Sequence, residues 1–210
     1  MTRSGALLVS GLVSVLAGCA LLPSGSAARR EHVYVIAPEQ TMDVRMAQSR
    51  CGTVQVAAGS AVVGHRGAAM MYSLDDIELK YFAYSRWGAP PTRMLRDQLR
   101  RFLRDSGAFD GVLDSPTVAR TRYQLELTDT EVIQRFEGEA SRVDMAFELR
   151  IFDGDRRRLL GSRRFVTDVS AGGDPASGAV AANAAARQLL GGAVDYVLEL
   201  CRDPAPVEGT

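Results

Sequence analysis

The sequence contains few of the side chains on which most enzyme chemistry depends. Its 210 residues include only two histidines, His32 and His65. The Gly-x-Ser-x-Gly, His-Glu-x-x-His and phosphate-cradling glycine patterns of common catalytic sites are all missing. We therefore predict that the protein is not an enzyme and carries no cofactor or metal. A hydrolase whose nucleophile and base are brought together only by folding is the alternative.

The chain also lacks an excess of charge of either sign. Lysine and arginine together number 25, aspartate and glutamate also number 25, and the formal net charge is +0. A nucleic-acid partner would require a basic excess concentrated on one face. The composition therefore argues against nucleic-acid binding.

Cysteine is scarce, and the first of the three cysteines lies in an export signal. Arg3 precedes an apolar run over 6–17 that is too short to span a bilayer as a permanent helix. The residues Leu16-Ala17-Gly18-Cys19 resemble the lipobox of bacterial lipoproteins, in which the cysteine thiol receives a lipid and the chain is cut before it. We predict a signal peptide at 1–18 and a covalent lipid on Cys19. An ordinary secretory signal, cut near 24–28, is the alternative.

The residues after Cys19 bear on where the protein is anchored. Residues 19–31 are small and polar without periodicity, which is typical of a flexible tether. An aspartate after the lipidated cysteine tends to retain proteobacterial lipoproteins at the inner membrane, and this chain has Ala20 instead. By that resemblance we expect anchoring at the periplasmic face of the outer membrane.

The two remaining cysteines, Cys51 and Cys201, would lie in a compartment where thiols oxidise. We expect them to form a disulfide that closes a loop of 150 residues. Such a bridge contributes on the order of 2–5 kcal/mol. Two buried free thiols are the alternative.

The remaining chain reads as one α+β domain at 32–202, followed by a flexible tail at 203–210. Short β-branched or apolar runs predict strands at 32–36, 53–57, 70–72 and 77–83, the last two forming a hairpin around Asp75-Asp76. Pro90 and Pro91 begin an amphipathic helix that runs through Ser106 and is ended by Gly107.

The second half alternates apolar and polar residues in a way that predicts antiparallel strands. Tyr123, Leu125 and Leu127 begin one strand, residues 143–151 form the next, and residues 159–169 return after the turn at Asp153-Gly154. Asp174 and Pro175 then begin a helix to about Cys201. The predicted order is β-β-(β-β)-α-β-β-β-α, a mostly antiparallel sheet with two main helices packed on one face.

Charges cluster at the turn after residue 152. Asp153-Gly154-Asp155 offers too few oxygen ligands for calcium, and we interpret it as a turn with a solvated charge cluster. The arginines beside it are candidates for docking to an acidic partner or to anionic lipid headgroups, although such a cluster also serves solubility and blocks edge-to-edge aggregation. They are Arg156, Arg157, Arg158, Arg163 and Arg164.

One segment carries a family resemblance. It comprises Gly64 to Tyr72, the stretch Tyr81-Phe82-Ala83-Tyr84-Ser85-Arg86-Trp87-Gly88-Ala89-Pro90-Pro91, the helix positions Met94, Leu95 and Leu99, and the exit Ser106-Gly107-Ala108-Phe109. Together with the lipobox, this pattern resembles the ABC-type transport auxiliary lipoproteins, a family that includes the PqiC-like proteins. The strand at 123–127 and the alanine-rich last helix resemble the family more loosely.

The resemblance implies a periplasmic accessory subunit of an ABC transporter that uses an MCE-domain protein to move lipids between the inner and outer membranes. It implies docking and no catalysis, and ring-forming MCE partners make a homo-oligomer plausible. Arg86 and Trp87 are further docking candidates, with Trp87 favoured as a packed residue and Arg86 as the exposed one. A structural envelope lipoprotein that scaffolds an outer-membrane assembly or secretion machine is the alternative.

Overall fold

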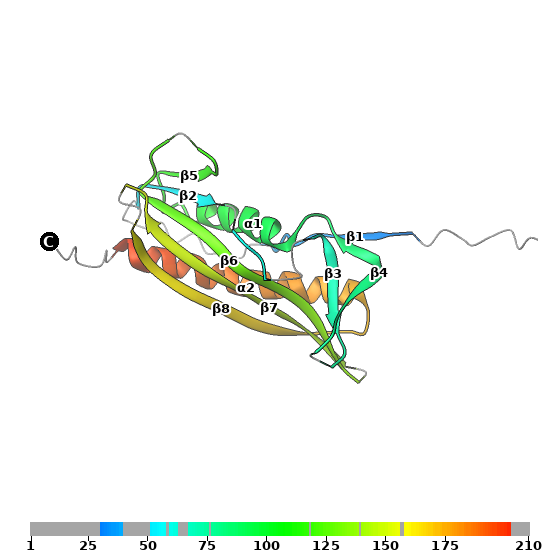
Figure 1. Ribbon diagram of the computed structural model, residues 1–210. Coiled ribbons are helices and arrows are strands. Elements are labelled where there is room, and N and C mark those ends of the chain that lie inside the picture. The colour runs from blue at the N-terminus through cyan, green and yellow to red at the C-terminus, as the bar shows by residue number, and fades with distance from the viewer. Residues whose placement is uncertain are drawn as a thin grey trace, which may run out of the picture. The chain divides into compact units, whose positions relative to one another are not determined.

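A long, curled sheet covered by two helices makes up the part of the chain shown in the computed structural model (Figure 1). The structure describes residues 30–39, 51–57, 59–62, 67–75, 77–117, 119–138, 140–155 and 158–202. Glu31–Thr210 form one structural unit, distinct from Met1–Arg30. Cys19, most of the predicted tether, His65, Arg156, Arg157 and the predicted tail lie outside the described residues.

The described residues form eight strands and two helices. In chain order these are β1 (His32–Tyr34), β2 (Thr53–Ala57), β3 (Ala69–Ser73), β4 (Leu79–Trp87), α1 (Pro91–Asp105), β5 (Gly111–Asp114), β6 (Tyr123–Glu137), β7 (Ala140–Asp153), β8 (Leu159–Ala171) and α2 (Pro175–Arg202). The hairpin of β3 and β4 and the meander of β6, β7 and β8 are antiparallel, as predicted.

Strand β6 is the central strand of the sheet, and it is long enough for two shorter strands to pair with it along the same edge. Its N-terminal half pairs parallel with β2, its C-terminal half pairs parallel with β3, and β7 pairs along its other side. Beyond β3 lie β4 and then β1, and beyond β2 lies β5. The described sheet therefore ends in β1 and β5 on one side of β6 and in β8 on the other.

The α+β class is confirmed, but two details of the predicted topology are wrong. The sheet is mixed, because β1 with β4, β2 with β5, and both β2 and β3 with β6 are parallel pairs. The four-residue strand β5 is also absent from the predicted order. Apolar alternation reveals which face of a strand is buried, but it does not identify the neighbouring strand.

The ends of both helices follow from local sequence signals. Pro91 opens α1, and Gly107 lies just beyond its end with φ of +66°, a conformation that glycine adopts without steric cost. At α2, the Asp174 carboxylate accepts hydrogen bonds from the backbone N–H groups of Ala176 and Ser177 at 2.8 and 3.0 Å. Asp174 is thus the N-cap that the sequence predicted.

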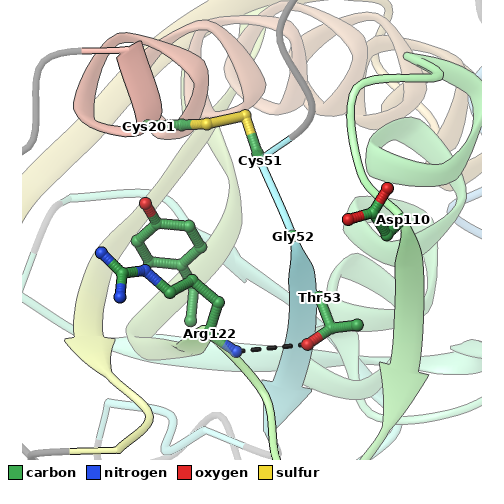
Figure 2. A pocket seen from close by; sticks show the side chains of 7 residues that line it. Cys51, Gly52, Thr53, Asp110, Arg122 and Cys201 are labelled. Atoms are coloured by element: carbon green, nitrogen blue, oxygen red, sulfur yellow. Dashed lines mark hydrogen bonds between the residues drawn. A yellow bond between two sulfur atoms is a disulfide. The ribbon is translucent and has the colours of Figure 1, made fainter.

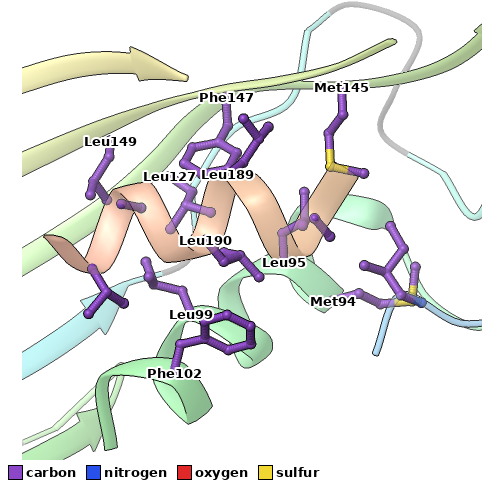
Figure 3. Close-up of a cluster of buried hydrophobic side chains, with 14 of the residues drawn as sticks. Met94, Leu95, Leu99, Phe102, Leu127, Met145, Phe147, Leu149, Leu189 and Leu190 are labelled. Carbon is purple, nitrogen blue, oxygen red and sulfur yellow. The ribbon is translucent and has the colours of Figure 1, made fainter. Parts of the chain in front are cut away.

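Both helices share one core with the same face of the sheet, as predicted (Figure 3). Leu127, Met145, Phe147 and Leu149 of the strands meet side chains from both helices, and all are buried. The helix residues are Met94, Leu95, Leu99 and Phe102 of α1 and Leu189 and Leu190 of α2. Many alanines in α2 let the helix approach the strands closely, since a methyl side chain keeps the backbones near one another.

Candidate docking surfaces

Trp87 and Arg86 have opposite environments although they are adjacent in β4. Trp87 is only 2% exposed and belongs to the core, and its backbone N–H donates to the carbonyl of Ala68 at 2.7 Å. The Arg86 side chain is 43% exposed and pairs with Glu31 at 2.9 Å. Successive residues of a strand point to opposite faces, so only Arg86 offers its side chain to a partner.

Exposed apolar side chains lie along β1, along β4 and in the turn that precedes β4, with Arg86 near the C-terminal end of β4. Of the large hydrophobic residues that are exposed, most belong to β1 and the residue after it, or to β4 and the turn that precedes it. They are Val33, Val35, Leu74, Ile77, Leu79, Tyr81 and Tyr84. We call these residues, with Arg86, the β1–β4 surface. Ile77, at the hairpin turn, is 91% exposed.

The turn that carries Ile77 is held by a polar side chain. The Asp75 carboxylate accepts hydrogen bonds from the backbone N–H groups of Ile77 and Glu78 at 3.1 and 2.9 Å. The bonds from Glu78 and then Ile77 lower the pKa of Asp75. The exposed position of Ile77 is therefore fixed by a hydrogen-bonded turn.

The β1–β4 surface was only partly predictable from sequence. The sequence indicates Arg86 as a candidate, whereas Val33 and Val35 have the pattern of ordinary strand residues in the run from His32 to Ile36. In that run Ile36 is buried while Val33 and Val35 are about half exposed. An apolar run without polar alternation contains no signal that separates its two faces.

The predicted arginine cluster does not lie on one face. Arg163 lies opposite Leu149 on the helix-covered face, stacks on Tyr196 with 3.8 Å from its guanidinium carbon to the ring centroid, and approaches Glu199. Arg164 lies opposite Glu148 on the uncovered face. Arg158 is exposed at the hairpin end. Strand alternation places Arg163 and Arg164 on opposite faces, although they are adjacent in the sequence.

The turn before these arginines is built differently from the solvated cluster that we predicted. Asp153 is 7% exposed, and its carboxylate accepts a hydrogen bond from the backbone N–H of Asp155 at 3.0 Å. The N–H of Gly154 donates to the carbonyl of Arg122 at 3.0 Å. Asp153 is therefore a buried turn residue rather than part of a solvated cluster.

Cys51 and Cys201 form a disulfide that joins the segment before β2 to the last turn of α2 (Figure 2). Beside it lies an open groove of about 510 Å³ lined by Gly52, Thr53, Asp110, Arg122 and Tyr123. A hydrogen bond with Tyr123 raises the pKa of Arg122. Because both sulfur atoms are in the bridge, neither is available here as a thiol nucleophile.

Two broader properties concern the described part of the chain. Within the described ranges, no group of three or more histidine, cysteine, aspartate or glutamate side chains is placed to hold a metal ion. None of the described helices has the length and apolar character needed to cross a membrane.

The described residues form an α+β domain whose exposed features include apolar side chains and arginines. The model of the family described as "ABC-type transport auxiliary lipoprotein component" matches residues 34–194. This chain belongs to that family, which confirms the resemblance found in the sequence. The family is one of lipoproteins, and membership implies a location in the bacterial envelope.

Solved structures share the fold, including two that cover most of this chain. Protein XCC0632 from Xanthomonas campestris is 21% identical, with a TM-score of 0.74 over 82% of this chain and 97% of that chain. A second structure, described as an uncharacterized protein, is 15% identical, with a TM-score of 0.55 over 84% of this chain and 99% of that chain. No curated protein sequence matches the chain.

Proposed function

We propose that this protein is an outer-membrane-anchored, periplasmic accessory subunit of an ABC transport system whose MCE-domain protein carries lipids between the inner and outer membranes. It acts by docking and not by catalysis. The observation that carries the proposal is the family match over residues 34–194, which extends from the end of β1 into the last third of α2. ATP hydrolysis would belong to a separate subunit.

The position of the predicted anchor supports docking close to a membrane. Lipid on Cys19 would be separated from His32, the first residue of β1, by a tether that spans at most roughly 40 Å when extended. Several acyl chains anchor a protein stably, whereas one chain does so only marginally. The domain would then work within a short distance of the outer membrane.

The β1–β4 surface is the proposed docking site for the MCE-domain protein. Aromatic residues and arginine are over-represented where proteins bind one another, and Tyr81, Tyr84 and Arg86 are all accessible here. Exposed apolar side chains that lie on neighbouring elements mark interaction sites more often than scattered ones do. Because β1 is the strand that follows the tether, the part of this surface formed by β1 and the end of β4 lies near the point where the chain enters the domain.

Site-specific photo-crosslinking in intact cells tests the proposal. A photoreactive residue replaces Ile77, Tyr84 or Arg86 in turn, and the matched control replaces Arg187, which is exposed on α2. We expect adducts with an MCE-domain protein from the first three positions and none from Arg187. Adducts with a secretin or with barrel-assembly machinery, and none with an MCE protein, would instead support the scaffolding alternative.

A second experiment tests the anchor independently of the partner. Replacing Cys19 with alanine removes the predicted lipid site and leaves the folded domain unchanged. We expect the Cys19→Ala protein to leave the membrane fraction and to lose transport function. If it still sediments with membranes and still functions, the proposed anchor is wrong.

A further inference from the structure

Strand β8 forms an edge of the sheet. It pairs with β7 along its length, and no other strand in the described ranges pairs with its second side. At 13 residues it is a long edge. Edge strands present unpaired backbone N–H and C=O groups, which are a template for another strand unless the edge is short, bulged, covered or protected by charged side chains that the incoming strand does not complement. The edge of β8 that faces away from β7 can therefore pair with a strand of another molecule.

The side chains at the middle of β8 form a regular pattern on the uncovered face. Arg164, Val166 and Asp168 alternate along the strand, and all three are exposed. Val166 is 64% exposed although it is apolar. Neither Arg164 nor Asp168 forms an ion pair with another residue in the described ranges. A cation and an anion thus flank an exposed apolar residue at equal distances along the chain.

No described residue of the neighbouring strand β7 forms an ion pair with Asp168. Asp168 lies directly opposite Asp144 of β7, and like charges in that arrangement are unfavourable. Asp144 is already bound by two guanidinium groups, Arg135 at 2.5 Å and Arg142 at 3.0 Å. Asp168 is the member of the pair that forms no ion pair within the described ranges, and it lies on the strand at the open edge of the sheet.

We propose that β8 pairs antiparallel with β8 of a second copy of this chain, about a two-fold axis that passes through Val166. In that register, Arg164 lies opposite the partner's Asp168, and Asp168 lies opposite the partner's Arg164. Val166 meets the partner's Val166 on the axis. An isologous contact of this kind uses the same surface on both subunits and closes after two copies.

The charges select this register over its neighbours. Centring the axis on Arg164 would place two arginines opposite one another, and centring it on Asp168 would oppose two aspartates. Centring it on Phe165 would pair Arg164 with Val166, and centring it on Thr167 would pair Asp168 with Val166, so neither register forms the ion pairs. An axis midway between two residues would pair the inner face of one strand with the outer face of the other, because side chains alternate. The register through Val166 keeps the helices of both copies on one side and forms both ion pairs.

Disulfide trapping of full-length protein in its membrane tests the contact. A Val166→Cys thiol would face its own copy, and Cα atoms opposite one another in an antiparallel pair lie about 4.5–5.5 Å apart, within disulfide range. Of the three natural cysteines, Cys19 is the predicted lipid site, and Cys51 and Cys201 form the existing disulfide. The introduced thiol is therefore the one expected to form a crosslink between copies. On mild oxidation we expect a covalent dimer from Val166→Cys and none from the exposed helix control Asp195→Cys. Failure of Val166→Cys to crosslink would overturn the proposal.

Charge exchange then tests the register in the full-length protein in detergent. Arg164→Asp and Asp168→Arg each create two like-charge contacts, and we expect each to weaken the dimer by about tenfold or more in sedimentation analysis. The double exchange restores both ion pairs with reversed polarity and should restore dimerisation. Single variants that dimerise like the wild type, a double variant that does not recover, or a wild type that is monomeric would each contradict the inference. Photo-crosslinking from Ile77 tests the proposed function, and dimerisation of the charge variants tests the β8 contact. Either experiment can fail while the other succeeds.

Discussion

The side-chain amide of Asn183 on α2 donates a hydrogen bond to the backbone carbonyl of Val35 at 2.9 Å. Its oxygen accepts a second bond from the backbone N–H of Ala37 at 2.8 Å. One amide thus binds the chain just after β1 in the way that a neighbouring strand would. These two hydrogen bonds hold the segment just after β1 against α2.

Removing this contact should release the segment after β1 more than it destabilises the whole domain. Asn183→Ala leaves two backbone groups without a protein partner, and we expect a loss of about 1–2 kcal/mol in the free energy of unfolding. Hydrogen exchange at the backbone amide of Ala37 should accelerate. Exchange in β7 should accelerate only as much as the loss in the free energy of unfolding of the whole domain requires. Asn183→Asp retains an acceptor for Ala37 and should give an intermediate result. Unchanged exchange at Ala37 would contradict the role assigned to these hydrogen bonds.

Two glycines of α2 should respond in opposite ways to the same substitution. A Cβ at Gly178 would lie 2.2 Å from the amide oxygen of Gln134, whose amide nitrogen is held by Ser141 and by the carbonyl of Gly172. A Cβ at Gly191 meets nothing within 4 Å. We expect Gly191→Ala to stabilise the helix by up to about 1 kcal/mol and Gly178→Ala to destabilise the protein.

Urea denaturation of the two glycine variants measures both effects on one scale. Equal stabilisation by both substitutions would show that Gln134 moves aside without cost. In that case the contact between β6 and the start of α2 would be looser than the structure indicates.

Stability in acid should depend on Asp174. The hydrogen bonds that its carboxylate accepts, first from Ser177 and then from Ala176, lower its pKa below the usual value of 3.8. A lowered pKa in the folded state means that the contribution is present above pH 3.8 and is lost as the pH falls through the folded value. The substitution Asp174→Asn keeps a side chain that caps the helix but does not titrate.

We therefore expect the free energy of unfolding of the wild type to fall more steeply than that of Asp174→Asn as the pH is lowered below about 4. Thermal or urea unfolding at a series of acidic pH values makes the comparison. Parallel curves for the two proteins would show that Asp174 does not contribute to acid sensitivity.

Alanine substitutions at the adjacent residues Arg86 and Trp87 should distinguish an effect on partner binding from an effect on stability. Trp87→Ala removes a buried ring and should cost about 3–5 kcal/mol. Arg86→Ala breaks one exposed ion pair with Glu31 and should cost at most about 1 kcal/mol. If the β1–β4 surface binds the partner, Arg86→Ala should still reduce crosslinking from Ile77. A normal crosslinking yield with Arg86→Ala would remove Arg86 from the docking site.

The Cys51–Cys201 bridge should be a major source of stability because it closes a loop of 150 residues. We expect Cys51→Ser, Cys201→Ser and the double variant to lose the same amount, about 2–5 kcal/mol. Mass analysis of non-reduced peptides identifies the bridge, and denaturation measures its effect. A wild type that gains no stability over the double variant would contradict this role.

Local sequence signals predicted the fold where one residue has one structural consequence. Gly107 and Asp174 mark helix ends, and alternation from Tyr123 to Leu127 identifies a one-face-buried strand. The parallel neighbours of β6 were not predictable, because they depend on connections through α1 and on contacts between distant segments. The short strand β5 was missed because four residues provide too little periodicity.

The candidate surfaces were predicted less well than the helices and strands. Arg163 and Arg164 are adjacent in sequence, yet one covers Tyr196 while the other lies on the uncovered face. Strand alternation alone would have separated them. The exposure of Val33 and Val35 depends on which elements cover β1, and that is decided only when the sheet assembles.

Recovery of the crosslinked partner from intact cells tests the proposed docking role most directly. With the photoreactive residue at Ile77, mass spectrometry of the adduct should identify an MCE-domain protein, and the adduct should disappear in the Cys19→Ala background. An adduct with secretion or barrel-assembly machinery and none with an MCE protein would contradict the proposed function.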